Sequence, residues 1–179
     1  MRLALPLVLI AGFLGGCTVG EDPYPAGWDP LSPLTGADCR HFQGTYADRG
    51  QAGHTGQASL SRELFGKDGP WQAAENVHFS FPQPDLLDVT VTPAPKPFVR
   101  RFSAKAGELR CEGGALYLRN RRWVYSDLMS GREDVKVELY RSGNYLVAHV
   151  NETMMGAMFM VVPLTGESTR WYRFSRLTP

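Results

Sequence analysis

The sequence has few of the residues that metal and catalytic sites require. Three cysteines and four histidines occur in 179 residues, and no CxxC pair or HExxH segment brings them to the spacing of a zinc site. A G-x-S-x-G nucleophile turn, an S-x-x-K pair and a phosphate-binding loop are also missing. These absences weigh against the motif-defined hydrolases and nucleotide-binding enzymes, so we expect a non-catalytic protein with no cofactor.

An excess of charge of one sign is missing too. Lysine and arginine total 19, against 18 aspartate and glutamate residues, whereas proteins that bind nucleic acid generally carry a basic excess. We therefore expect no nucleic-acid partner. The apolar run from Leu3 to Phe13 is well short of the ~20 residues that cross a bilayer as a helix. Its length is typical of the core of a signal peptide.

That apolar run is followed by a cysteine. Arg2 precedes the run, and Leu14-Gly15-Gly16-Cys17 comes after it. This arrangement resembles the lipobox of bacterial lipoproteins, which reads Leu, a small residue, Gly or Ala, and then Cys. The resemblance implies a lipoprotein signal peptide over residues 1–16 and acylation of Cys17. Because Thr18 rather than aspartate follows, it also implies a lipid anchor on the periplasmic face of the outer membrane. The alternative is an ordinary secretory leader with a chance cysteine.

Beyond the leader, the composition divides the chain in two. Residues 17–38 are rich in proline and glycine, which predicts an extended tether rather than a helix or strand. Residues 39–179 predict a single β-domain. Two cysteines remain in it, Cys39 and Cys111, and export to an oxidising compartment favours a disulfide between them. The alternatives are a metal-binding pair or two buried thiols.

Short alternating segments with glycine- and proline-rich connections make up the β-domain. The pattern predicts one helix at 59–66, where Ser59 can cap the start and Gly66 can end it. Residues 49–57 are expected to form a loop. Hairpin turns are expected at 106–107 and 113–114. The expected strands lie within 39–48, 76–81, 86–92, 98–104, 108–113, 115–120, 121–126, 135–150 (two strands), 154–164 and 169–177.

This succession of strands predicts a mainly β fold, an antiparallel meander that is closed as a small barrel or packed as a β-sandwich, with one short helix. Two short segments resemble lipocalin-like β-barrels. Gly44-Thr45-Tyr46 stands where that family has Gly-x-Trp on its first strand, and Trp171-Tyr172-Arg173-Phe174 forms an arginine-bearing aromatic strand near the end. The resemblance favours the barrel over the sandwich.

Methionines are unusually dense in one segment, Met154 to Met160, which holds four of the six in the chain. Thioether sulfur suits Cu(I), so a soft-metal site of Met155, Met158, Met160 and His149 is one hypothesis. The competing interpretation is a buried strand whose methionines fill irregular space, and it is the one we favour.

The arginines at positions 100, 101, 110, 119, 121 and 122 predict either a basic patch or a solvated surface balanced by acids. Without the predicted leader, which contains Arg2 and no acidic residue, the chain has 18 basic and 18 acidic residues, and this zero net charge favours the balanced surface. We expect an outer-membrane lipoprotein whose β-domain binds a protein, an envelope component or a small apolar ligand. The alternatives are copper handling and, less well supported, hydrolysis by a carboxylate pair that sequence motifs do not show.

Overall fold

The computed structural model describes residues 22–32, 38–54, 56–92, 97–126, 129–158 and 162–177. The predicted leader, Cys17, Met160 and the side chain of Met158 lie outside the described part. The elements, in chain order, are η1 (Cys39–Phe42), β1 (Gly44–Ala47), β2 (Arg49–Ala52), β3 (Gln57–Ser59), α1 (Leu60–Phe65), β4 (Asn76–Gln83), β5 (Leu86–Thr92), β6 (Phe98–Ser103), β7 (Leu109–Glu112), β8 (Ala115–Tyr125), β9 (Met129–Ser142), β10 (Tyr145–Met158) and β11 (Val162–Leu177).

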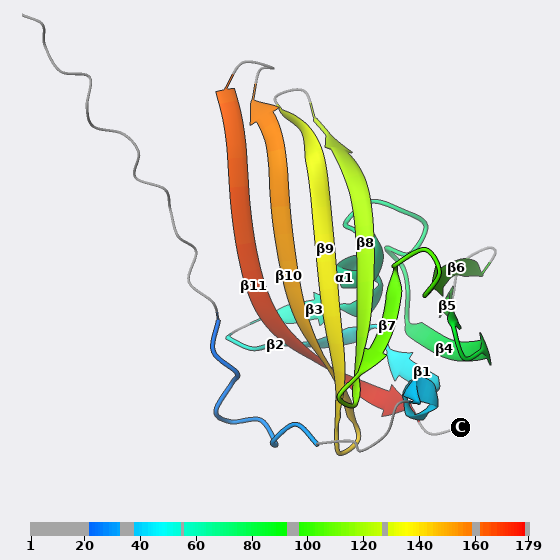
Figure 1. Cartoon of the computed structure of the whole chain (residues 1–179). Coiled ribbons are helices and arrows are strands. Elements are labelled where there is room, and N and C mark those ends of the chain that lie inside the picture. Colours follow the sequence, from blue (N-terminus) through cyan, green and yellow to red (C-terminus); the bar gives the residue numbers. More distant parts are fainter. Residues whose placement is uncertain are drawn as a thin grey trace, which may run out of the picture.

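The strands form one antiparallel sheet in the order β6-β5-β4-β1-β11-β10-β9-β8-β7, and β2 and β3 pair beside β11. The mainly β class, the antiparallel pairing and the single short α-helix are as predicted. The long strands β8–β11 run past α1 to free ends, while the shorter strands curl away beneath them (Figure 1). The four longest strands therefore form a curved wall with α1 on one face.

The predicted closure into a barrel is wrong. The main path of the sheet ends at β6 and β7, which are consecutive in the chain but do not pair along their length, and β3 pairs only with β2. Past the turn at 104–107, the amide of Glu108 still donates to the Ser103 carbonyl at 3.1 Å. β7 then pairs with β8 across the turn at Gly113 and Gly114, which both have positive φ. The hairpin expected at 113–114 is confirmed, whereas the one expected at 106–107 is a turn between two sheet edges.

One hydrophobic core lies between the short strands β4–β6 and the long strands β8–β11. β5 alternates strictly between buried and half-buried residues, as expected of a strand with one face against a core. Phe42, Tyr46, Phe79, Phe102 and Phe174 are fully or almost fully buried, and they come from η1 and from strands on both sides of β1. Within the described residues, no helix is long and apolar enough to cross a membrane.

The predicted disulfide fits the structure, although its setting differs from the prediction. The Cα atoms of Cys39 and Cys111 are 5.9 Å apart, which is inside the range that disulfides require. Cys39 does not open the first strand, however: it begins the 3-10 turn η1, which packs against β8 and β4. β1 pairs with β4 and β11 rather than with β7 or β8. The bridge therefore ties the turn before β1 to the edge strand β7.

Residues 22–32 lie against the domain. The indole Nε1 of Trp171 donates to the Asp22 carbonyl at 2.9 Å, and the Tyr24 ring meets Trp171 edge-on at 5.0 Å. The guanidinium of Arg173 lies 5.0 Å from the centre of the Trp28 ring. The described part of the predicted tether is thus docked on β11, which its proline and glycine content did not indicate.

Candidate functional site

The α1 helix is held in place by a buried carboxylate. Asp48, 3% exposed, accepts hydrogen bonds from the Ser59 hydroxyl and the Ser61 amide, both at 2.7 Å. The Ser59 side chain in turn accepts from the Arg62 amide, so the predicted cap is confirmed. Leu60, Leu64 and Phe65 turn into the core. On the other side of this short helix, the charged side chains of Arg62 and Glu63 line the space between α1 and the sheet.

The inner face of β8–β11, which is the face toward α1, changes character along the strands. Near the core, the inward positions of β8, β9 and β10 are leucine, valine and alanine, such as Leu118 beside Val137 and Val150. Two and four residues further along, polar side chains enter the same inward positions. One row reads Asn120, Val135, Glu152 and Ser168, and the next reads Arg122, Glu133, Met154 and Gly166.

These inward polar side chains contact one another and α1. Arg122 forms an ion pair with Glu133 and lies 3.9 Å from Glu152. Glu152 also accepts a hydrogen bond from the Ser168 hydroxyl at 3.3 Å and lies 4.0 Å from Arg170. The Asn120 amide donates to the Leu64 carbonyl at 3.1 Å, which fixes the end of α1 against β8. The wall therefore presents charges of both signs.

Glu63 is the buried carboxyl of this region, and it projects from α1. It is 9% exposed, and burial raises its pKa to about 7, assisted by the negative charge of Glu152. Arg170, Arg62 and a hydrogen bond from Tyr172 oppose this rise in the pKa. Burial and the nearby Glu63 likewise raise the pKa of Tyr172 to about 12. Glu63 thus changes its charge near neutral pH.

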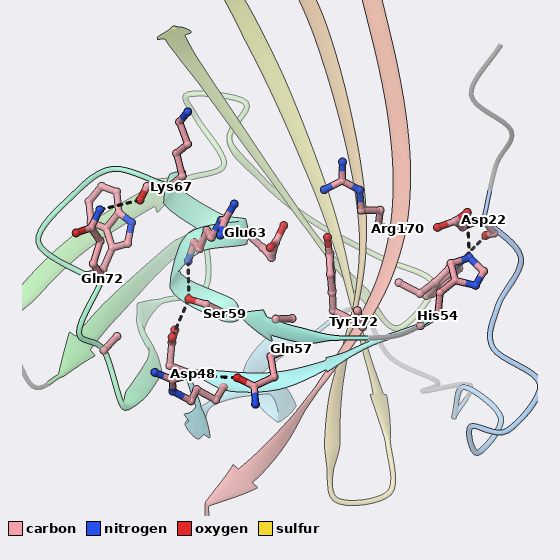
Figure 2. A pocket seen from close by; sticks show the side chains of 18 residues that line it. Asp22, Asp48, His54, Gln57, Ser59, Glu63, Lys67, Gln72, Arg170 and Tyr172 are labelled. Carbon is pink, nitrogen blue, oxygen red and sulfur yellow. Dashed lines mark hydrogen bonds and ion pairs between the residues drawn. The ribbon is translucent and has the colours of Figure 1, made fainter. Parts of the chain in front are cut away.

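Two open depressions of about 720 and 650 Å³ lie between α1 and the sheet. Both are lined by Arg62, Glu63, Lys67 and Arg170, so the two depressions adjoin at these residues, and together we call them the inner groove. Figure 2 shows Glu63 on α1 pointing across the cleft to Tyr172 and Arg170 on β11, with Asp22 and His54 at one end. The rest of its charged lining includes Asp48, Arg122, Glu133 and Glu152.

The soft-metal residues that the structure describes are not brought together. The His149 ring stacks on Trp171 at 4.1 Å, with its Nδ1 3.6 Å from Glu138. Met155 lies six residues further along the same strand, a separation of roughly 20 Å. Met160 and the Met158 side chain lie outside the described residues. Among the residues described, no group of three or more histidine, cysteine or acidic side chains could hold a metal ion.

The expected burial of the methionine segment is wrong at Met155, whose side chain is 63% exposed. For the arginines, the balanced surface is confirmed, since each of the six has an acidic partner. The pairs are Arg100–Glu108, Arg101–Asp88, Arg110–Glu112, Arg119–Asp134, Arg121–Asp134 and Arg122–Glu133.

The residues of the inner groove were missed from the sequence. Glu63 was expected only as part of a short helix, and Glu152 and Arg170 were not singled out. One signal was present in β10, where the inward positions Leu146, Ala148 and Val150 are followed at the same spacing by Glu152. A charged residue that continues an apolar alternation marks the point where a core face becomes a cleft.

Comparisons with known proteins give no relative. No family model, no curated protein and no solved structure matches this chain. Function is therefore argued from the groove itself.

Proposed function

We propose that the protein is an outer-membrane lipoprotein, anchored through Cys17 on the periplasmic face, whose β-domain binds an extended polar ligand in the inner groove without catalysing a reaction. The ligand would be an envelope component or a protein segment that carries charges of both signs. The observation that supports binding is the pair of adjoining open depressions, both lined by Glu63, Lys67 and Arg170.

The lining favours a polar ligand over the small apolar ligand that a closed barrel would suit. An apolar molecule would remove Arg122, Glu152 and Arg170 from water without replacing their hydrogen bonds, which is costly. A ligand with its own amines and carboxylates could instead pair with these groups. The length of the groove, from His54 and Asp22 to Tyr125, suits an extended chain better than a compact molecule.

Photo-crosslinking in cells tests this use of the groove. A photoreactive amino acid at Lys67, in the groove, should give a specific covalent adduct with an envelope component. The matched control is Lys105, whose side chain is 87% exposed and does not line the groove. The same adducts from both positions, or none from Lys67, would contradict the proposal.

A separate experiment tests the anchor. Cys17→Ser should leave the protein without acyl chains, because the substituted residue has no thiol to modify. Since stable attachment needs two or more chains, the variant should leave the membrane fraction. Lipid labelling and membrane retention that equal those of the unsubstituted protein would show that Cys17 is not the anchor.

A second candidate function is hydrolysis of an envelope polymer, and the carboxyl pair Glu63 and Glu152 favours it. A carboxyl group with a pKa of about 7 can donate a proton at neutral pH, and an ionised partner can activate water. Purified protein would then release soluble fragments from isolated cell-wall polymer. Both Glu63→Gln and Glu152→Gln should abolish that release, and a lack of release by the unsubstituted protein would exclude this substrate.

A further inference from the structure

A second surface lies on the other side of the same sheet, near the free ends of the long strands. Trp123 and Tyr125 on β8 are 67% and 74% exposed, and their rings stack at 6.3 Å with an angle of 22°. Trp123 shares a row with Arg132 on β9 and Met155 on β10. We call Trp123, Tyr125, Arg132 and Met155 the outer patch. Exposed aromatic and apolar side chains that gather in this way mark an interaction surface.

The charge around the outer patch is positive. On this face of β8 and β9, between Arg119 and Arg132, alternation places four basic residues and one acidic residue, Asp134. Asp134 pairs with both Arg119 and Arg121. Among the residues that the structure describes, no carboxylate lies within ion-pair distance of Arg132 or Lys136. Aromatic side chains beside unneutralised cations match the headgroup region of an anionic bilayer.

The docked N-terminal segment lies on the same face as the outer patch. Trp171, which holds the Asp22 carbonyl, shares a row with His149 on β10. His149 and Met155 are six residues apart on one strand, and an even spacing puts both on one face of the sheet. Asp22 also lines one end of the inner groove, so the chain leaves the domain toward Cys17 beside β11, at the border between the two faces.

The length of chain before Asp22 limits how far the domain can stand from its anchor. Four residues lie between Cys17 and Asp22, and the five steps from one Cα to the other span at most ~18 Å when fully extended. The patch row lies six residues along β11 from Trp171, at Thr165, or roughly 20 Å away. A bilayer that holds acyl chains on Cys17 therefore lies within ~18 Å of Asp22, which allows the outer face of the sheet to lie against the same bilayer.

We propose that the outer patch is a membrane-contact surface, seated on the bilayer that holds the lipid anchor. Trp123 and Tyr125 lie at the headgroup level, Met155 contacts the acyl boundary, and Arg132 and Lys136 pair with lipid phosphates. This inference rests on the anchor proposed for Cys17. Its consequence concerns the groove: because the inner groove opens on the opposite face of β8–β11, the contact turns the groove away from the membrane and toward the aqueous space.

The test uses the full lipidated protein in vesicles of phosphatidylcholine with a minor fraction of phosphatidylglycerol. Met155→Cys carries an environment-sensitive fluorophore, and Lys105→Cys, labelled identically, is the control. Both side chains are exposed, so neither change disturbs the core. The label at 155 should shift to shorter wavelength and be quenched several-fold more strongly by headgroup-level nitroxide lipids than the label at 105. Replacing Trp123 and Tyr125 with serine should reduce that quenching.

Flotation of the same samples separates the two proposals. Protein that does not float with the vesicles would refute the Cys17 anchor. Protein that floats, but whose label at 155 is quenched no more than the label at 105, would overturn the membrane-contact surface while the anchor stands. That second result would leave the outer patch to a protein partner. Stronger quenching with phosphatidylglycerol than with phosphatidylcholine alone is expected from the cations.

Discussion

Glu63 should make the protein less stable as the pH rises from about 4.5 to about 7. Below about pH 4.5, its ordinary pKa, this carboxyl is protonated in both the folded and the unfolded chain. Above pH 7 it is ionised in both, and only the folded state holds the charge in a buried place. Between pH 4.5 and pH 7 the carboxyl is protonated in the folded chain and ionised in the unfolded chain. The free energy of unfolding therefore decreases as the pH rises over this range.

The magnitude follows from the rise in the pKa. A pKa of about 7 instead of 4.5 corresponds to about 3 kcal/mol at 1.36 kcal/mol for each unit. Glu63→Gln keeps the shape of the side chain and removes the ionisation. The variant should therefore be more stable than the unsubstituted chain by about 3 kcal/mol at alkaline pH, relative to their difference in acid. This is a large share of the 5–15 kcal/mol that holds a typical domain folded.

Urea denaturation of both chains, without the predicted leader, at about pH 4 and about pH 8 measures the difference. The matched control is Glu112→Gln, because the Glu112 side chain is 65% exposed and water screens its charge. We expect little change in the control at either pH. A stability difference between Glu63→Gln and the unsubstituted chain that does not vary with pH would refute the argument.

Two further outcomes are expected. Denatured, exported protein should contain no free thiol from Cys39 or Cys111, and replacing both by serine should cost roughly 2–5 kcal/mol of unfolding free energy; two free thiols would contradict the bridge. Trp171→Ala removes the hydrogen bond to Asp22 and the contact with Tyr24, so limited proteolysis within residues 22–32 should become faster. Trp123→Ala is the matched control, and equal cleavage rates in the two variants would show that Trp171 does not hold this segment.

The strands that could be predicted are those with a clear alternation of buried and exposed residues. β4, β5 and β9 have such patterns. The turn between the two strands expected within 135–150 falls at Gly143, which adopts a positive φ. β2 and β3 were missed because they are short and contain little apolar side chain: Arg49–Ala52 has no fully buried residue. Their pairing depends on β11, which comes more than a hundred residues later.

The open sheet could not be predicted, because closure depends on which strands pair with each other and not on the alternation of residues within each strand. The sequence pattern predicts β6 and β7 as two strands joined by a glycine-containing turn. This pattern does not distinguish a hairpin from two strands that lie at separate edges of a sheet. What decides the outcome is distant in sequence: β7 pairs with β8, and Cys111 reaches η1, 72 residues away. Local alternation contains no information on such contacts.

The inner groove and the outer patch arise from one feature of the sequence, which is that β8–β11 are longer than the core they cover. Up to Leu118 and Val150 the inward residues are buried. Beyond that point the strands continue past α1, so both of their faces meet solvent or a ligand. The inward face becomes charged at Arg122 and Glu152, while the outward face becomes aromatic at Trp123 and Tyr125. Folding alone requires neither change, and this difference between the two faces is the reason for proposing two roles, ligand binding in the inner groove and membrane contact at the outer patch.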